Sequence, residues 1–321
     1  MKRNLACLLI AAVLLPLIAT AAVATASVAS ERRHRTFPTR EQALSRPNVV
    51  EMSGTSDTQL RVGSLRNNTT YDLRGFVSTA YRKEVTSYPL SFGSQEATSG
   101  LVVIGGQVLG GNPREWTWQQ WEDMSEVGGA LYIVADGPVV SYDLRADNVF
   151  DLFKPRPAGP DAKFLIDGAY GTYDRDDAVE NDVEMSGTIR HSLFDGINSG
   201  VSIGQETGNP HAVTRIIDSV FVFRPMPNER ASDGLGHAAM FKQLGAGHVV
   251  MRRDTVCYTE TPIDTDRLRN WMPGTYEDVT VVLGPGFVGR YPRPVPHGVT
   301  ITRDWSVCDA AIARWHKRHP S

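Results

Sequence analysis

The sequence predicts an all-β protein, a right-handed parallel β-helix (solenoid) with short capping helices. Short apolar runs rich in β-branched residues recur, each bounded by Gly, Pro, Asp or Asn, as strands bounded by turns are. Segments of helical period do not alternate with these runs, which argues against a doubly wound α/β sheet. Similar phrases also return at irregular intervals, as they do in solenoids. The clearest runs are Leu101–Ile104, Leu131–Val134, Phe164–Ile166, Val249–Met251 and Val279–Leu283.

The recurring phrase is an Asp, a small polar residue and an apolar pair. It is found at Asp147, Asp177, Asp218 and Asp254, in steps of 30, 41 and 36 residues. Uneven steps argue against a propeller and suit stacked coils of about 20 to 45 residues with loops of variable length. We therefore expect these aspartates to occupy equivalent positions in successive coils, a structural role.

The first 26 residues predict a secretory signal peptide. Lys2 and Arg3 precede the apolar stretch Leu8–Ile18, and Ala24 to Ala26 supplies small residues at a cleavage site. The alternative is an uncleaved membrane anchor, since the apolar stretch is just long enough to span a bilayer. With cleavage we expect a secreted or periplasmic protein with no membrane span.

Three further segments follow along the chain. Residues 27–99 are polar, lack periodicity and predict an N-terminal arm and cap, whereas residues 100–305 contain the strand runs and predict the β-helix domain. Residues 306–321 predict a C-terminal capping helix, with an acidic residue, Asp309, in its first turn and basic residues in its last. A second short helix is expected from Asn112 to Ser125, with Trp118 and Trp121 on one face.

Composition excludes several classes of protein. Hydrophobic residues make up 41% and charged residues 21%, which is ample for a core and argues against disorder. Lys plus Arg is 33 and Asp plus Glu is 36, so the chain carries no basic field for nucleic acid. Only Cys257 and Cys308 follow the leader, without a zinc pattern, and they are compatible with one disulfide or with two separate thiols.

The segment Asp174–Asp182, together with Gly187–Ile189 and Ser192–Gly196, carries a resemblance to a known family. It resembles secreted bacterial β-helix proteins of the pectate-lyase-like superfamily, in a branch with an Arg-Asp-Asp-x-x-Glu-Asn-Asp motif. The resemblance covers residues 100 to 320 and implies the fold. It implies function only broadly, because the superfamily includes lyases, glycoside hydrolases, esterases and non-enzymatic surface proteins.

The acidic run itself holds the candidate catalytic residues. In the repeat alignment, Glu180 and Asp182 replace mostly apolar residues of other coils, and such departures from a local rule are frequent at functional sites. Asp176 is the third acid and Arg175 the adjacent cation. Paired carboxylates serve glycoside hydrolysis and a carboxylate cluster also suits Ca²⁺, so a metal remains open. The alternative is a purely structural network of acids.

Arginine and histidine supply the expected substrate-binding groups. Of the 33 cations 27 are Arg, and Arg145 and Arg156 precede the acidic run, where they could hold a sugar carboxylate or pair with the acids. His191 follows it and could transfer protons or be plain polar surface. The sequence therefore predicts a secreted polysaccharide-active enzyme, a lyase or a glycoside hydrolase. The alternative is a non-catalytic extracellular surface or carbohydrate-binding solenoid.

Overall fold

A computed structural model describes most of the chain from residue 37 to residue 320. The gaps are residues 64–65, 82–87, 94–98, 126–127, 160, 205, 207, 229–234, 237–238, 244, 246, 261–267, 289–290 and 292. The expected signal peptide lies outside the described residues. The chain divides into two compact units, residues 1–39 and 40–321, and the fold described below is that of the second.

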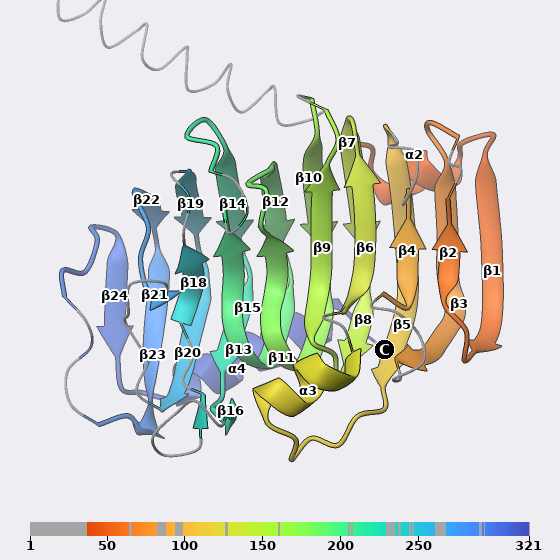
Figure 1. The fold of residues 1–321 in the computed structure, drawn as a ribbon. Coiled ribbons are helices and arrows are strands. Elements are labelled where there is room, and N and C mark those ends of the chain that lie inside the picture. The colour runs from red at the N-terminus through yellow and green to blue at the C-terminus, as the bar shows by residue number, and fades with distance from the viewer. Residues whose placement is uncertain are drawn as a thin grey trace, which may run out of the picture. The chain divides into compact units, whose positions relative to one another are not determined.

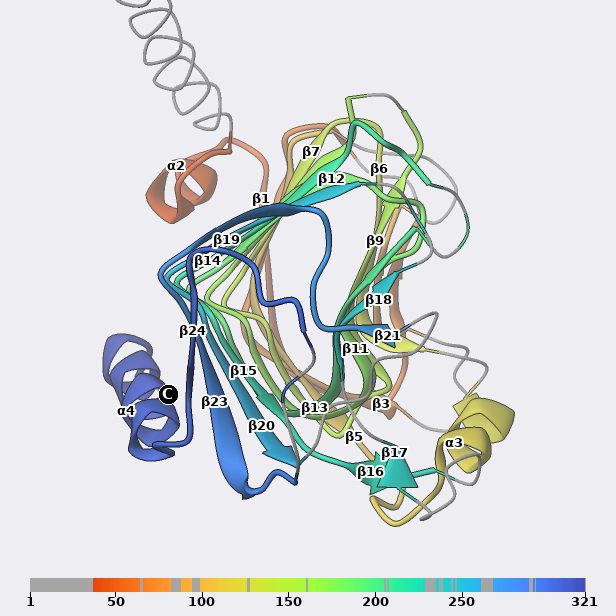
Figure 2. The ribbon, with the colours of Figure 1, turned by 90° about the vertical axis from the view of Figure 1, so that its left-hand side faces the viewer.

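The second unit is a stack of coils whose strands form three parallel ladders (Figures 1 and 2). A coil runs through the three ladders in turn, and its strands pair with those of the coils before and after it. Five strands are long enough to belong to two ladders and turn a corner within their length: β1 (Val49–Ser56), β3 (Thr70–Tyr81), β5 (Leu101–Gly110), β11 (Tyr170–Asn181) and β13 (Leu193–Ile203).

The first ladder starts with the N-terminal halves of the strands β1 (Val49–Ser56), β3 and β5 (Leu101–Gly110). It continues through β7 (Pro138–Tyr142), β10 (Lys163–Asp167), β12 (Ser186–Arg190), β14 (Val213–Ile217), β19 (His248–Arg252) and β22 (Gly274–Glu277).

The second ladder contains the C-terminal halves of β1, β3 and β5, then β8 (Arg145–Asp147), the N-terminal parts of β11 and β13, β15 (Val220–Phe223), β20 (Thr255–Glu260), β23 (Val279–Gly286) and β24 (Val299–Thr302). The third contains β2 (Leu60–Val62), β4 (Leu90–Phe92), β6 (Gly129–Ala135), β9 (Asp151–Pro157), the C-terminal parts of β11 and β13, and β18 (Ala239–Gln243). Two pairs are antiparallel: β21 (Leu268–Arg269) on β18, and β16 (Met226–Pro227) with β17 (Leu235–Gly236).

The hydrophobic core fills the inside of the coils because alternate side chains of every strand point inward. In the first ladder the paired positions stack Ile166, Ile189, Ile216, Met251 and Tyr276 above one another. All five are buried members of one core cluster. Stacking of like side chains from coil to coil thus explains why the apolar runs recur. The expected all-β solenoid is confirmed.

The corner between the first and second ladders has a repeated backbone conformation. In six successive coils one residue has a positive φ there, and the amide of one corner donates a hydrogen bond to the carbonyl before the next corner. Asp, Gly and His tolerate this left-handed region better than most residues. The corner residues are Asp143, Gly168, His191, Asp218, Arg253 and Asp278.

This corner corrects the repeat alignment. Asp218 lies at the corner, whereas Asp254 lies one position later, beside Ser219 of the preceding coil. Asp147 and Asp177 lie within strands that belong to different ladders. The four aspartates are therefore not equivalent, because a motif of one acid and two apolar residues fits both a corner and a strand.

The coils also begin earlier than expected. Strand β1 pairs in parallel with β3, and β3 with β5, so residues 49–92 already contribute to the stack. Residue 100 marks no structural break. The region expected to be an arm and cap contains strands whose apolar residues are interspersed with Ser, Thr and Gly, which hid their period.

In the described part of the chain, three helices lie outside the coils. Helix α2 (Arg40–Leu44) and helix α4 (Ser306–Arg318) are on one side, and α3 (Trp118–Ser125) is on another (Figure 2). Helix α3 is shorter than expected, and its Trp118 and Trp121 rings lie 5.7 and 6.4 Å from the ring of Phe150.

Helix α4 is where the sequence places it but does not close the end of the stack. Its Cys308, Ala311 and Trp315 pack against the outer face of the second ladder, in a separate apolar cluster with residues such as Val222. Cys308 forms a disulfide with Cys257 of β20. Among the described residues, no helix is both long and apolar enough to traverse a bilayer.

Candidate functional site

The third ladder carries a row of polar side chains on its outer surface. Phe153, Val179, Val201 and Phe241 from neighbouring strands are paired and belong to the core. The next residue on each strand must then point the other way. These outward residues are Lys154, Glu180, Ser202 and Lys242, so parallel pairing stacks an acid between basic and polar groups.

Lys154 joins two of the predicted acids. Its Nζ lies 2.7 Å from Oε2 of Glu180 and 3.1 Å from Oδ2 of Asp182. Ser202 Oγ donates a hydrogen bond of 3.0 Å to the other oxygen of Asp182. The Lys154, Glu180 and Asp182 side chains are only 11%, 10% and 4% exposed. These charges are therefore largely removed from water yet still reach the surface.

Lys242 joins the third predicted acid to its neighbour. Its Nζ contacts the carboxylate of Asp176 and lies 2.8 Å from Oδ2 of Asp177. The pairing of β11 with β13 shifts register between Asp174 and Asp177, and such a bulge re-aims side chains. Through this bulge Asp176 and Asp177 share one lysine.

Asp151 of β9 completes the group. Its Oδ1 accepts a hydrogen bond of 2.9 Å from the amide of Asp177, while Oδ2 has no hydrogen-bond partner among the described residues. Asp151 is fully buried. We call Asp151, Asp176, Asp177, Glu180 and Asp182, with Lys154 and Lys242, the acid–lysine cluster.

Five carboxyls facing two lysines cannot all be ionised cheaply in a buried place. Burial raises the pKa of Glu180 to about 8, although Lys154 opposes this. Burial and the nearby Asp176 raise the pKa of Asp177 to about 7, and burial raises that of Asp151 well above its ordinary value. The cluster therefore holds neutral carboxyls at neutral pH.

Asp182 behaves in the opposite way. Burial acts to raise its pKa, but hydrogen bonds with Glu180, Lys154 and Ser202 outweigh burial and lower it. The surroundings thus favour the protonated form of Glu180 and the ionised form of its neighbour Asp182. Adjacent carboxyls whose environments separate their pKa values are the arrangement that divides acid and base roles.

The cluster also offers a set of metal ligands. Carboxylate oxygens of Asp151, Asp176 and Asp177 lie within 4.8 Å of one another. Ca²⁺ takes six to eight oxygen ligands, and here the ammonium of Lys242 already neutralises two of the three acids. As arranged, this group does not fit Ca²⁺, because the ion would have to displace Lys242.

Arg175 does not share the acids' surroundings. It is 1% exposed and donates hydrogen bonds to the main-chain oxygens of Trp116, at 3.0 Å, and Pro227, at 2.7 Å. These contacts tie two outer loops to the coil. We therefore assign Arg175 a structural role and remove it from the catalytic set.

The three predicted substrate-binding residues are distributed over the molecule. Arg156 follows Lys154 on β9 and forms an ion pair with Glu206. His191 is a corner residue whose Nδ1 lies 2.8 Å from Asp167. Arg145 starts β8 of the second ladder. Only Arg156 is near the acid–lysine cluster, so the expected combination with Arg145 and His191 is not formed.

Comparison with known protein families, with curated proteins and with solved structures gave no match. The residues that sequence reasoning missed are Lys154, Lys242 and Asp151. A signal for the lysines exists, since the chain has only six and both lie within apolar strand runs, after Phe153 and Phe241.

Proposed function

We propose that the protein is a secreted polysaccharide-active enzyme that hydrolyses glycosidic bonds at the acid–lysine cluster. The observation that carries the proposal is the pair Glu180 and Asp182 on Lys154, in which one carboxyl has a pKa of about 8 and the other a lowered pKa. A carboxyl that stays protonated at neutral pH can act as the general acid that protonates the leaving glycosidic oxygen.

The second catalytic group follows from geometry. Glu180 and Asp182 share the single ammonium of Lys154, at 2.7 and 3.1 Å, so Asp182 is already held by the lysine that contacts Glu180. Asp182 is then a positioning residue for the Glu180 proton. The role of base falls to Asp176, which pairs with a different lysine and whose side chain is 12% exposed.

The charges of the cluster favour hydrolysis over the lyase reaction. Elimination from a uronate requires a cation that neutralises the sugar carboxylate. Lys154 and Lys242 of the cluster already contact two carboxylates each, and the neighbouring Arg156 contacts Glu206. We therefore expect an uncharged sugar at the reacting position.

The test is a panel of neutral and uronate polysaccharides, assayed both for new reducing ends and for the absorbance of unsaturated uronates. We expect reducing ends without unsaturated products. Glu180→Gln and Asp176→Asn should lower kcat by about 10² to 10⁴. Asp182→Asn should chiefly move the alkaline limb of the pH profile, because it alters the environment of the Glu180 proton.

The matched control is Asp195→Asn, which removes an acid from an ion pair on the second ladder, 3.0 Å from Arg224. It should retain activity. Undiminished hydrolysis in Glu180→Gln, with the fold intact by circular dichroism, would leave the cluster as a structural network. Unsaturated uronate products would show that the reaction is an elimination and not a hydrolysis.

A further inference from the structure

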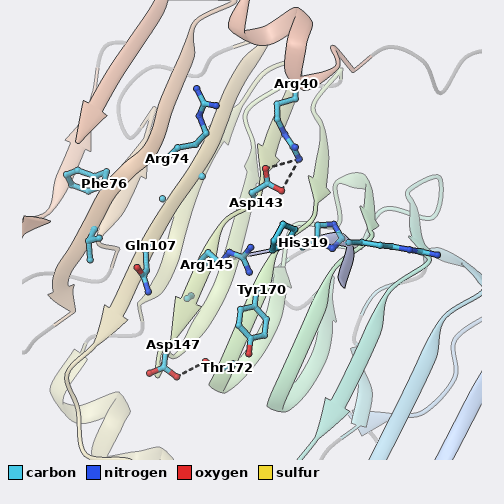
Figure 3. A pocket seen from close by; sticks show the side chains of 16 residues that line it. Arg40, Arg74, Phe76, Gln107, Asp143, Arg145, Asp147, Tyr170, Thr172 and His319 are labelled. Carbon is cyan, nitrogen blue, oxygen red and sulfur yellow. Dashed lines mark hydrogen bonds and ion pairs between the residues drawn. The ribbon is translucent and has the colours of Figure 1, made fainter. Parts of the chain in front are cut away.

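A second polar site lies on the side of the coils that carries α2 and α4. It is a groove of about 760 Å³ on the outer surface of β3, β5, β8 and β11. Arg40 of α2 lies at one edge and His319, just after α4, at another (Figure 3). We call this the arginine groove. Its volume is in the range of small-ligand sites, roughly 300 to 1,000 Å³.

Basic side chains outnumber acidic ones around the groove. The basic lining residues are Arg40, Arg74, Arg145, Arg318 and His319, against Asp143 and Asp147. Arg40 pairs with Asp143 at 2.8 Å, Arg74 pairs with Asp72, and Asp147 pairs with Arg114 at 2.8 Å, while burial lowers the pKa of His319. Among the described residues, Arg145 and Arg318 are the groove cations that form no ion pair. The groove therefore presents a positive surface within a chain of negative net charge.

Arg145 is the cation best placed to bind a ligand. It forms no ion pair with any residue in the described part of the chain. Its guanidinium lies 5.5 Å from the ring centre of Tyr170 and 5.4 Å from that of Trp315, and such cation–π contacts hold it in position. A fixed guanidinium binds a carboxylate or sulfate with two hydrogen bonds and loses little freedom on binding.

The rest of the lining suits a ring with hydroxyl groups. Gly105 and Gly106 turn the backbone of β5 with positive φ angles, and the space beside Gly105 is filled by Arg74, whose side chain borders the groove. Phe76 adds an apolar surface, while the Gln107 amide and the Tyr170 hydroxyl supply hydrogen-bonding groups (Figure 3). An apolar floor with a few polar groups is typical of sites for sugars and similar molecules.

We propose that the arginine groove binds an anionic sugar of an oligosaccharide, with Arg145 on its carboxylate or sulfate group. The proposal is independent of catalysis at the acid–lysine cluster, because the two sites lie on different ladders. It gives Arg145 the carbohydrate-binding role expected from the sequence, at a separate site. A negatively charged glycan could thus be retained by a protein that otherwise repels it.

The experiment is calorimetric titration of the full chain with trigalacturonate and with its methyl ester, at low salt. We expect the triuronate to bind and the ester to bind at least tenfold more weakly. Arg145→Met keeps the apolar stem and should weaken triuronate binding at least tenfold. Arg318→Gln, at the other side of the groove, should weaken it about threefold. Galactose sulfate and inorganic sulfate are titrated as competitors, which separates sugar from bare oxyanion.

Arg224→Met is the matched control, because it removes one arginine outside the groove. It should change triuronate affinity less than twofold, and Glu180→Gln should leave the affinity unchanged even if it abolishes hydrolysis. Circular dichroism and thermal unfolding establish that each variant is folded. Equal binding of the ester, equal losses in Arg145→Met and Arg224→Met, or competition by inorganic sulfate as strong as by galactose sulfate would each overturn the proposal.

Discussion

The acid–lysine cluster and the corner between the first two ladders contain the same types of residue in opposite settings. In the cluster each lysine faces two acids and all of these side chains are largely buried. At the corner, Asp218 pairs with Arg253, whose side chain is 53% exposed. A second acid, Asp167, accepts from Arg190 and His191. The acid–lysine cluster has more acids than cations, whereas at the corner each of these acids has at least one cation of its own.

The consequence is a difference in protonation. A side-chain hydrogen bond from Arg253 lowers the pKa of Asp218. Burial acts to raise the pKa of Asp167, but its bonds to His191 and Arg190 lower it. In the cluster, burial instead raises the pKa of Glu180 and Asp177. The comparison teaches that acids with cations of their own stay ionised even when partly buried, whereas two acids that share one buried lysine are driven apart, with the pKa of Glu180 raised and that of Asp182 lowered.

The largest difference should appear when a cation is removed. Lys242→Met leaves Asp176 and Asp177 buried without their positive partner, and removal of one member of a buried ion pair costs about 3 to 5 kcal/mol. Arg253→Met breaks an exposed pair and should cost less than about 1 kcal/mol. Urea unfolding at neutral pH measures both values. Equal losses of unfolding free energy in the two variants would show that burial and the sharing of one lysine by two acids do not distinguish the two regions.

A smaller loss of stability should follow removal of the disulfide. Among the described residues, this bond is found on the side of the corner and not on the side of the cluster. Replacing Cys257 and Cys308 by Ser frees α4 from β20 and should cost about 2 to 4 kcal/mol. Because α4 borders the arginine groove and not the cluster, triuronate binding should weaken while hydrolysis is retained. Loss of hydrolysis in a folded double variant would contradict the separation of the two sides.

The smallest effect concerns pH. Glu180 has a folded pKa above its ordinary value, so its contribution to stability is present below about pH 4.5 and is lost as the pH rises through 8. Asp218 has a lowered pKa, so its contribution is present above about pH 4 and is lost as the pH falls.

Unfolding free energies of the wild type should therefore decrease from about pH 5 to about pH 8.5, and Glu180→Gln should reduce this decrease by about 1 kcal/mol or more. Asp218→Asn should leave this decrease unchanged. It should lower the unfolding free energy by less than about 1 kcal/mol at neutral pH and leave it unchanged at about pH 3. An identical pH dependence in the wild type and Glu180→Gln would show that Glu180 titrates normally.

The fold was accessible from the sequence because stacked coils repeat their apolar residues. Runs such as Phe164–Ile166 and Val249–Met251 are strands of the first ladder. Which residue of each coil lies at the corner could not be predicted from the sequence. A left-handed corner accepts Asp, Gly, His and even Arg253, so no single residue type marks it, and alignment on aspartates selected strands and corners alike.

The candidate site was accessible only in part. The acids of the site could be predicted because they lie close together in sequence, between Asp174 and Asp182. The lysines that govern their protonation come from β9 and β18, which pair with β11 and β13 through the register of different coils. Local sequence carries no information on that register. For the same reason the sequence associated Arg145 with the acids, whereas it lies on β8 of the second ladder.

The register shift in β1 has a consequence for the solubility of the stack. Every solenoid ends in a strand with an unpaired edge, which is a template for association with another copy. Among the described residues β1 pairs only with β3, and its pairing is irregular between Glu51 and Ser53, followed by Gly54 with a positive φ. Bulges and twists of this kind prevent a second strand from docking in register. We therefore expect the mostly exposed, irregular strand β1 to disfavour edge-to-edge pairing with another copy of the chain.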